Sequence, residues 1–433
     1  MFSLLYNGAI LLFALCFLPK LLWQRMRHGK YKESLGARLG LKMPQFFPRE
    51  GELVFWIHAI SMGETRAVIP LYRLMRQTYP NAAILISSTT ETGHAEAKRS
   101  MPDARAHFFL PLDLSWIMRR LIKRLRPHAL ILCESDFWYH LIAIAKEQHA
   151  HVCLINGKVS ERSCSRFQKI PFFTRRLFQN IDYFCLQSER HLQRFSLLGI
   201  PSEKLLVTGN IKLDVVPKKM TAEEKEQFCQ TLGITTGDRI LVIGSTHDPE
   251  EEWLLAMLDT LWKKIPRLKV LLVPRHPERF GDVAQKIAQK GISYGQFSQK
   301  SCKEKPLILI DAMGLLNQCY QLADVAIVGG SYVAHVGGHN VFEPVLFGVP
   351  VLFGPHMHSQ LDLQELVING KAGLQVSLEE LPDAILSLLE NPEKHAAMRT
   401  HCLSLAQSVP GATQRTFGAI QQFLSSTRLC TIL

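Results

Sequence analysis

The chain has 433 residues, of which 47% are hydrophobic and 20% are charged, and its net charge is +12 at pH 7. This length excludes one small core and suits two α/β domains of ordinary size. The positive charge is uneven, with 30 basic and 15 acidic residues through Lys212 but 20 and 23 in the remainder. We therefore expect the first half, and not the second, to face an anionic partner.

The N-terminal segment is predicted to be a membrane anchor. Residues 2–18 form a nearly uncharged apolar run, close to the ~20 residues of a membrane span. A removed signal peptide is not expected, because no basic stretch precedes this run and no cleavage site follows it. The alternative is a helix that lies in the membrane surface or packs on the protein. Basic residues after the run predict that the following chain is cytoplasmic: Lys20, Arg25, Arg27, Lys30, Lys32 and Arg38.

Two series of short apolar strands alternate with helical stretches, as parallel β-α-β units require. The first series is expected at 53–60, 83–89, 107–110, 129–133, 151–155, 183–187 and 205–209. The second is expected at 240–245, 270–274, 307–311, 325–328 and 349–353. The predicted parts are an anchor at 1–20, a first domain at 21–215, a second at 216–410 and a C-terminal helix at 411–433 that crosses back to the first domain.

Two segments of the first domain, at 115–126 and 166–178, mix apolar and basic side chains. Either segment alone is typical of a core helix with a solvated basic face. Together with the anchor, they predict a domain that lies against the surface of an anionic membrane. Nucleic acid is the competing partner, but the chain has no RNP-type or zinc-finger pattern.

Several charged residues of the first domain follow strand ends, where doubly wound domains bind their ligands. Glu64 stands in the first turn of a helix, either as an electrostatic cap or as a general base. Glu134 stands where a buried strand ends, and a charged residue is seldom placed there for stability. Asp136 is expected to cap the next helix. Lys212 and Asp214 are expected to face the cleft between the domains, where a lysine would oppose a departing phosphate or a substrate carboxylate.

Four strand-end motifs of the second domain together predict a site for a nucleotide donor. They are GSTHDPEE at 244–251, VPRHPERF at 273–280, DAMGLL at 311–316 and GGHNVFEP at 337–344. Arg275 can meet a phosphate or a base, and the glycines at 337–338 open a helix N-terminus that favours anions. Glu343, three residues beyond Asn340, can accept two ribose hydroxyls. Each motif alone has many false positives, and the prediction rests on their number.

Metal and covalent chemistry are not predicted. His335, His339, His356 and His358 have spacings that zinc can use, but no HExxH motif or cysteine cluster accompanies them. The ten cysteines form no CxxC pair and several lie in apolar runs, which favours reduced, buried thiols. No GxSxG motif or Cys–His arrangement indicates a covalent nucleophile.

The motifs as a set resemble those of the 3-deoxy-D-manno-octulosonic acid (Kdo) transferases of lipopolysaccharide assembly. The resemblance covers nearly the whole chain and rests on HAISMGE, ESDFW, NGKVSERS, TGNIKLD, GSTH, PRHPERF and GGHNVFEP in this order. It implies an α/β GT-B fold with two Rossmann-like domains, an interdomain cleft and an anchor in the cell inner membrane. It also implies inverting transfer of Kdo from CMP-Kdo to the 6′-hydroxyl of a tetraacylated lipid A precursor (lipid IVA), without a metal or another cofactor.

The resemblance assigns roles to single residues. Glu64 matches the catalytic base, and Glu134 and Lys212 match groups that stabilise the transition state. Lys158 stands near a customary arginine and ESDFWY replaces the usual ETELWP, which leaves the acceptor range and the number of Kdo units open. Leu315 replaces a usual glutamate, so that only backbone contacts are expected there. The expected contacts to CMP are Pro274, Arg275, Met313, Gly314, Leu315, Asn340, Val341, Phe342 and Glu343.

The sequence leaves two alternatives open. One is a GT-B transferase that uses another nucleotide sugar, such as a UDP-hexose. The other is a membrane-tethered nucleotide-binding scaffold without catalysis. For the favoured interpretation the expected partners are CMP-Kdo, a phosphorylated lipid A precursor and the anionic inner-membrane surface, with no nucleic acid.

Overall fold

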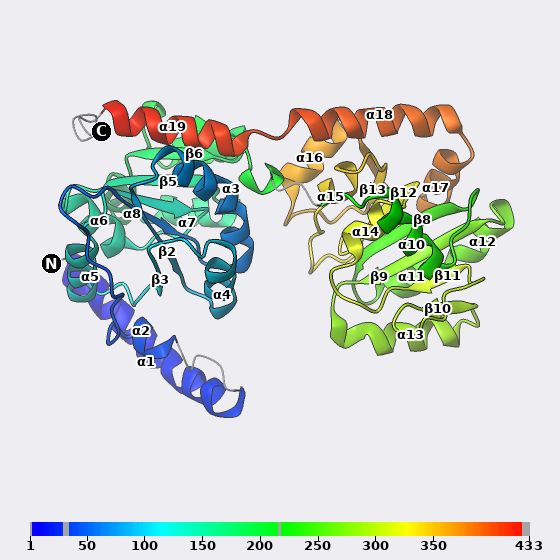
Figure 1. Ribbon diagram of the computed structural model, residues 1–433, viewed down its shortest axis with the longest axis horizontal. Helices are drawn as coiled ribbons and strands as arrows, with labels where there is room; N and C mark the ends of the chain where they lie inside the picture. Colours follow the sequence, from blue (N-terminus) through cyan, green and yellow to red (C-terminus); the bar gives the residue numbers. More distant parts are fainter. Residues whose placement is uncertain (1, 29–33, 215–217, 427–433) are drawn as a thin grey trace. The chain divides into compact units, whose positions relative to one another are not determined.

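The computed structural model describes residues 2–28, 34–214 and 218–426 (Figure 1). Two compact units make up the chain: Met1–Val215 with Pro410–Leu433, and Val216–Val409. We call these unit 1 and unit 2 and describe each by itself. Two of the basic residues expected after the anchor, Lys30 and Lys32, lie outside the described residues.

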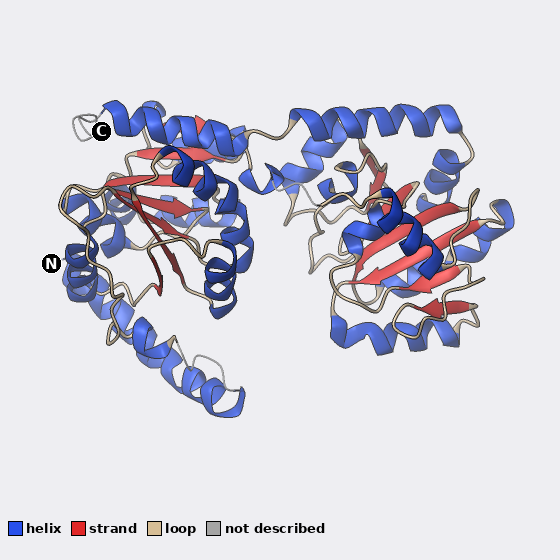
Figure 2. Ribbon diagram, viewed as in Figure 1, coloured by secondary structure: helices blue, strands red, loops and turns tan. Residues whose placement is uncertain are grey.

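Unit 1 contains a seven-stranded parallel sheet of order β3-β2-β1-β4-β5-β6-β7 (Figure 2). The chain order reverses between β1 and β4, which makes the carboxyl ends of these two strands the expected ligand site. β1, β2 and β4 are buried along their whole length, as the apolar strands of a parallel sheet must be when helices cover both faces. The strands are β1 (Val54–His58), β2 (Ala83–Ser88), β3 (Ala106–Phe109), β4 (Ala129–Cys133), β5 (His151–Gly157), β6 (Tyr183–Leu186) and β7 (Leu205–Val207).

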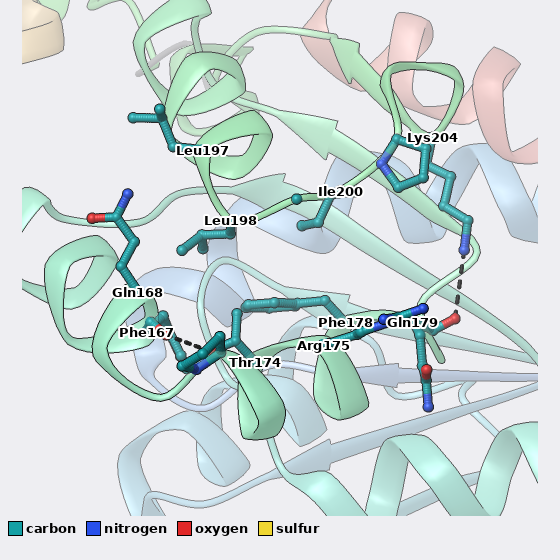
Figure 3. A pocket seen from close by; sticks show the side chains of 13 residues that line it. Phe167, Gln168, Thr174, Arg175, Phe178, Gln179, Leu197, Leu198, Ile200 and Lys204 are labelled. Atoms are coloured by element: carbon teal, nitrogen blue, oxygen red, sulfur yellow. Dashed lines mark hydrogen bonds between the residues drawn. The ribbon is translucent and has the colours of Figure 1, made fainter.

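Helices cover both faces of this sheet because neighbouring residues of each strand point to opposite sides. Trp56 and Leu130 belong to a core with side chains of α5, α6, α8 and α9. Phe55 and Ile131 belong to a core with side chains of α3, α4 and α19. The helices are α2 (Leu35–Arg38), α3 (Met62–Thr78), α4 (Glu91–Ser100), α5 (Ser115–Leu125), α6 (Tyr139–Glu147), α7 (Glu161–Lys169), α8 (Pro171–Phe178), α9 (Glu189–Leu197) and α19 (Ala412–Ser426). A groove lies between α8 and the end of α9 (Figure 3).

Unit 2 contains a second seven-stranded parallel sheet, of order β10-β11-β9-β8-β12-β13-β14. Its chain order reverses between β8 and β12. The strands are β8 (Arg239–Thr246), β9 (Leu268–Pro274), β10 (Tyr294–Gln296), β11 (Leu307–Leu309), β12 (Val325–Val328), β13 (Val351–Phe353) and β14 (Gly373–Gln375). The helices are α10 (Ala222–Leu232), α11 (Glu250–Ala256), α12 (Leu258–Lys264), α13 (Phe280–Gln289), α14 (Leu316–Tyr320), α15 (Phe342–Val345), α16 (Leu361–Asn369), α17 (Leu381–Leu389) and α18 (Pro392–Ser408).

The prediction of two parallel-sheet α/β units is confirmed, but it missed the two edge strands β10 and β14 of unit 2. Each is three residues long and only partly buried. A strand that is not covered on both faces has no continuous apolar run, so the pattern used for the central strands does not detect it.

The helix α1 (Phe2–His28) is tied to unit 1 by its first turns. Asn7, 6% exposed, donates to Ser115 Oγ at 2.9 Å and accepts from the Ser115 N–H at 3.0 Å. Ser3 Oγ lies 2.9 Å from His140 Nε2. Within the part of the chain that the structure describes, no helix is both long enough and apolar enough to span a bilayer, so the expected spanning anchor is not supported.

The last helix, α19, packs on unit 1 through Phe417, Ile420 and Leu424. Its first turn is capped from a distant part of the chain. The Asp214 carboxylate accepts hydrogen bonds from the N–H groups of Gly411, at 2.8 Å, and Thr413. Asp214, which we expected at a cleft, therefore has a structural contact that satisfies open donors at a helix N-terminus.

Candidate active site

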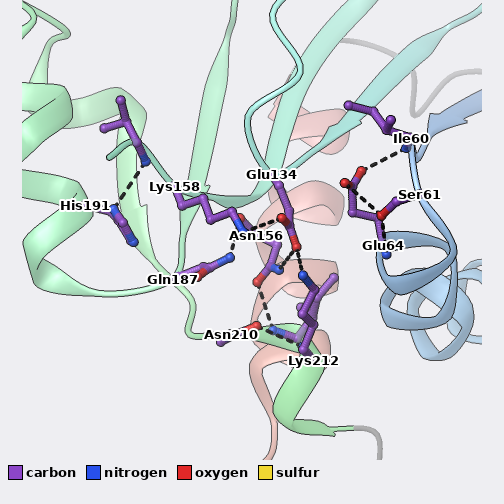
Figure 4. A network of polar contacts seen from close by, with 12 residues as sticks. Ile60, Ser61, Glu64, Glu134, Asn156, Lys158, Gln187, His191, Asn210 and Lys212 are labelled. Carbon is purple, nitrogen blue, oxygen red and sulfur yellow. Dashed lines mark hydrogen bonds and ion pairs between the residues drawn. The ribbon is translucent and has the colours of Figure 1, made fainter. Parts of the chain in front are cut away.

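Glu64 lies in the first turn of α3, directly after the switch strand β1 (Figure 4). It is 8% exposed, and its carboxylate accepts from the Ile60 N–H at 2.8 Å and from Ser61 Oγ at 3.2 Å. Burial raises the pKa of Glu64, the Ile60 N–H lowers it, and the negative charge of Glu134 raises it again, with a net rise. Burial therefore outweighs the hydrogen bonds that lower the pKa and makes Glu64 a stronger base.

Glu134 follows the other switch strand, β4, and is held between two lysines. It is 4% exposed, and its Oε2 lies 2.6 Å from Lys158 Nζ while its Oε1 contacts Lys212 Nζ. Burial opposes ionisation of Glu134, but the two ammonium groups hold its pKa below the usual value. Its φ of +65° is a left-handed backbone conformation that is strained for a residue with a side chain.

The two lysines remain available to a ligand. Their side chains are 40% exposed for Lys158 and 38% exposed for Lys212. Two ammonium groups with one carboxylate between them leave a net charge of +1. The arrangement fixes both cations in place and leaves them able to bind a further anionic group.

Asn156 at the end of β5 joins this network to its surroundings. The side chain is fully buried. Its Nδ2 lies 3.4 Å from Glu134 Oε1, and its Oδ1 accepts from the Ile211 N–H at 3.0 Å. The bond to Ile211 fixes the start of the short 3₁₀ segment Ile211–Asp214, which carries Lys212. The motif NGKVSERS gave Asn156 no role, and its place at the end of a buried strand was the available signal.

Asp136 does not cap the following helix, contrary to our expectation. Its Oδ2 lies 2.5 Å from Nε2 of His58, which is fully buried at the end of β1. His58 Nδ1 in turn lies 2.7 Å from Ser87 Oγ on β2. Asp113 instead accepts from the N–H groups at the start of α6, including that of Leu141 at 2.8 Å. Asp136 therefore ties the loop that carries Glu134 to β1.

The expected donor residues of unit 2 form two groups. Phe342 is fully buried, as is Val341, so only their backbones can meet a ligand. Asn340 Nδ2 donates to Glu343 Oε1 at 3.3 Å, and its Oδ1 accepts from the Phe342 N–H at 3.0 Å. Burial raises the pKa of Glu343, although Arg275, exposed after β9, lowers it in part. Pro274 is buried at the end of β9.

The second group follows β11 and consists of Met313, Gly314 and Leu315. Met313 is 57% exposed. Gly314 has a φ of +86° with open space around it, so the backbone can be approached closely. Leu315 precedes the first turn of α14. The turn can therefore present N–H groups to a ligand.

A pair of histidines lies beside Arg275, and the sequence had indicated His339 only as one of four histidines with zinc-compatible spacing and His247 only as part of GSTHDPEE. His247 Nε2 and His339 Nε2 are 2.7 Å apart, with stacked rings. Burial lowers the pKa of both residues to about 4, and neighbouring positive groups such as Arg275 add to this. Both are neutral at pH 7. In the described ranges no three His, Cys, Asp or Glu side chains are grouped so that they could hold a metal ion.

Comparison with known proteins gives one consistent result. A family model described as 3-Deoxy-D-manno-octulosonic-acid transferase (kdotransferase) matches residues 31–215. The 3-deoxy-D-manno-octulosonic acid transferase of Chlamydophila psittaci is 35% identical over 99% of this chain and 98% of its own. That of Haemophilus influenzae is 32% identical over 95% of each chain. A glycosyltransferase structure from Rickettsia africae is 14% identical with a TM-score of 0.60, over 87% of this chain and 99% of that one, and shows a shared fold.

Proposed function

Because the chain belongs to the 3-deoxy-D-manno-octulosonic acid transferase family, and is thus a glycosyltransferase of lipopolysaccharide biosynthesis, we propose that it moves Kdo from CMP-Kdo to a tetraacylated, phosphorylated lipid A precursor with inversion. The observation that carries the proposal is the pair of buried carboxylates after β1 and β4. Glu64 has a raised pKa and Glu134 a lowered one. Environments that raise the pKa of one carboxyl group and lower that of its neighbour are typical of sites that use the two groups in different roles.

In the proposed reaction Glu64 accepts the proton of the acceptor hydroxyl. The hydroxyl oxygen forms a bond to the anomeric carbon of Kdo, and the bond from that carbon to the phosphate oxygen of CMP breaks. Glu64 suits this step because its pKa lies nearer to neutral than that of an ordinary glutamate. The Lys212 ammonium, fixed by Glu134, offsets negative charge that develops in the transition state.

Unit 2 is proposed to bind the donor. Glu343 accepts the ribose hydroxyls, and Arg275 binds the phosphate. The backbone N–H groups at 313–315 and 340–341 supply further polar contacts to CMP. The donor carries a single phosphate, so we expect the reaction to proceed without a metal.

We also propose that α1 lies in the interface of the inner membrane, with both units on the cytoplasmic side. Its exposed surface is rich in large apolar side chains. Arg27 lies over the ring of Trp23, with its guanidinium carbon 5.5 Å from the ring centroid. An apolar helix face with flanking cations is suited to the surface of an anionic membrane. The exposed apolar residues are Leu4, Leu5, Leu11, Leu12, Phe13, Leu15, Phe17 and Trp23.

The test is a transfer assay with CMP-Kdo and a tetraacyl lipid A precursor, in which product mass is followed in steps of one Kdo. Wild type is compared with Glu64→Gln, and with Glu50→Gln as a matched control, because Glu50 is exposed and precedes β1. We expect product from wild type and the control and none from folded Glu64→Gln. The number of steps also counts the sugars added.

The two alternatives give different results. No product from folded wild type, with thermal protection by UDP rather than CMP, would favour a transferase of another nucleotide sugar. Protection by CMP without product from any sugar donor would favour a binding scaffold.

A further inference from the structure

A groove on unit 1 lies apart from the candidate active site. Its walls are the end of α7, α8, the end of α9 and the 3₁₀ turn Ser202–Lys204 (Figure 3). Its volume is about 660 Å³, within the roughly 300 to 1,000 Å³ of small-molecule sites. α8 and the 3₁₀ turn lead into the amino-terminal ends of β6 and β7. Glu64 and Glu134 follow the carboxyl ends of β1 and β4, so the groove belongs to the other edge of the sheet.

The lining of the groove is apolar with a positive rim. Phe167, Phe178, Leu198 and Ile200 supply its wall. Arg175 and Lys204 are the basic members, and the thirteen lining residues include no Asp or Glu. Other hollows of the chain differ, since the one beside Tyr79 includes two glutamates and the one beside Met220 includes Glu224.

The two cations can meet an anion. Lys204 Nζ donates to the carbonyl oxygens of Ile181, at 2.9 Å, and Gln179, at 3.5 Å, which holds the ammonium group at the groove and leaves one of its three N–H donors for a ligand. Arg175 is exposed and has no carboxylate partner among the residues that the structure describes. A guanidinium group in this setting favours a phosphate, which it binds with two parallel hydrogen bonds.

The helix α8 links the groove to α1. Leu197 of the lining is 66% exposed, and Phe172 on α8 is 63% exposed. The ring of Phe172 lies 5.8 Å from that of Phe2 in α1, and Arg176 stands over both rings. The helix that lines the groove with Arg175 therefore also contacts the helix that we place in the membrane interface.

We propose that this groove binds one acyl chain of an anionic glycerophospholipid, with the lipid phosphate held by Arg175 and Lys204. The inference rests on the proposed membrane association and adds a specific lipid site to it. A free phosphate would leave the apolar wall uncovered, and a neutral lipid would leave the two cations without an anion. One anionic lipid satisfies both parts of the groove.

The experiment measures binding of the full chain to vesicles of phosphatidylcholine with and without phosphatidylglycerol. Arg175→Glu is compared with Arg162→Glu, a charge reversal at an exposed residue of α7 outside the lining. We expect Arg175→Glu to weaken binding to the anionic vesicles by about tenfold and Arg162→Glu by about twofold at most. Leu197→Ser is compared with Leu206→Ser, since Leu206 is 38% exposed on β7 and outside the lining; only Leu197→Ser is expected to weaken binding.

A short-chain, soluble phosphatidylglycerol titrated calorimetrically gives a direct reading. We expect it to bind wild type and to bind Arg175→Glu and Leu197→Ser more weakly, while inorganic phosphate binds none of them appreciably. Equal losses for Arg175→Glu and Arg162→Glu would show diffuse attraction and overturn the proposal. So would unchanged lipid binding in both groove variants, or tighter binding of an acidic peptide than of the lipid.

The same preparations separate this proposal from the proposed function. Thermal unfolding shows that each variant is folded. Kdo transfer is measured on wild type, and its absence together with intact lipid binding would overturn the proposed function alone. Transfer together with unaltered lipid binding in the groove variants would overturn the lipid site alone.

Discussion

The two units share one kind of parallel sheet but place different chemistry at the ends of their strands. In unit 1 the groups are ionised, with Glu134 between Lys158 and Lys212. In unit 2 a histidine pair beside Arg275 is neutral at pH 7, since burial lowers the pKa of His247 and His339 to about 4. The two sites therefore differ in the side chains that follow each strand and not in the fold.

Two buried carboxyl groups show why the units differ. Glu134 is buried but has two ammonium groups in contact, and its pKa is lowered. Glu343 is buried with a partial contribution from Arg275, and its pKa is raised. Fixed charge beside the reacting atoms serves a reaction in which charge develops, whereas the groups of unit 2 are proposed only to hold the nucleotide. We therefore expect changes in unit 1 to alter turnover and changes in unit 2 to alter donor affinity.

After Glu64→Gln, the largest effect is expected for Lys212→Met. This change removes the cation proposed to offset charge in the transition state and leaves Glu134 paired with Lys158. Transfer, measured as kcat/KM, should fall by about 10² to 10³. The affinity for CMP, measured by calorimetry, should change by less than about twofold. An equal loss of CMP affinity would remove the distinction between the units.

Lys158→Met is the matched comparison on the same carboxylate. Lys212 still neutralises Glu134 in this variant, so we expect transfer to fall by about tenfold. Loss of transfer as severe as that of Lys212→Met would mean that the two lysines act as one unit.

The next effect is expected in unit 2, for Glu343→Gln. The amide has one acceptor oxygen in place of two, so one of the two proposed ribose hydrogen bonds is lost. CMP affinity should fall by about tenfold, while kcat at saturating CMP-Kdo stays within about threefold of wild type. Glu278→Gln is the control, because Glu278 is exposed in the turn after β9. A fall in kcat with unchanged CMP affinity would place Glu343 in the reaction.

The pH dependence of transfer tests the comparison between the two units. A base must be ionised to act, and burial raises the pKa of Glu64, so kcat/KM should fall with decreasing pH along a limb above the ordinary glutamate value of about 4.3. The histidine pair should not contribute to this limb between pH 8 and about 5, because His247 and His339 remain neutral down to about 4. A limb that moves in Glu343→Gln, where the native carboxyl also has a pKa raised by burial, would assign the titrating group to unit 2.

The sequence predicted central strands and strand-end residues well, for a physical reason. Strands buried on both faces are continuous apolar runs, and the carboxyl ends of parallel strands share one edge. Glu64 and Glu134 could therefore be assigned to one edge from β1 and β4 alone. The link between His58 and Asp136 could not, because it depends on which strands become neighbours and on the backbone path of one loop.

Contacts between residues far apart in the chain could not be predicted from the sequence either. Asn7 is one polar residue in an apolar run, and its contact with Ser115, 108 residues away, is one of those that dock the start of α1 on unit 1. The same holds for Asp214, which stands two residues from Lys212 and was assigned by that proximity. Its partners lie at the start of α19, nearly 200 residues further along the chain.

The smallest effect on transfer is expected for Asp214→Ala, which separates these two neighbours. Removing the carboxylate leaves the N–H groups of Gly411 and Thr413 without their acceptor, which should lower the free energy of unfolding by about 1 to 2 kcal/mol in urea. α19 should stay docked, because Thr416 Oγ1 donates to Thr208 Oγ1 at 2.9 Å and its apolar face remains buried. Transfer per folded molecule should then fall by less than about threefold. A loss near that of Lys212→Met with unchanged stability would show that Asp214 acts in the reaction, and the 3₁₀ turn would carry two functional charges rather than one.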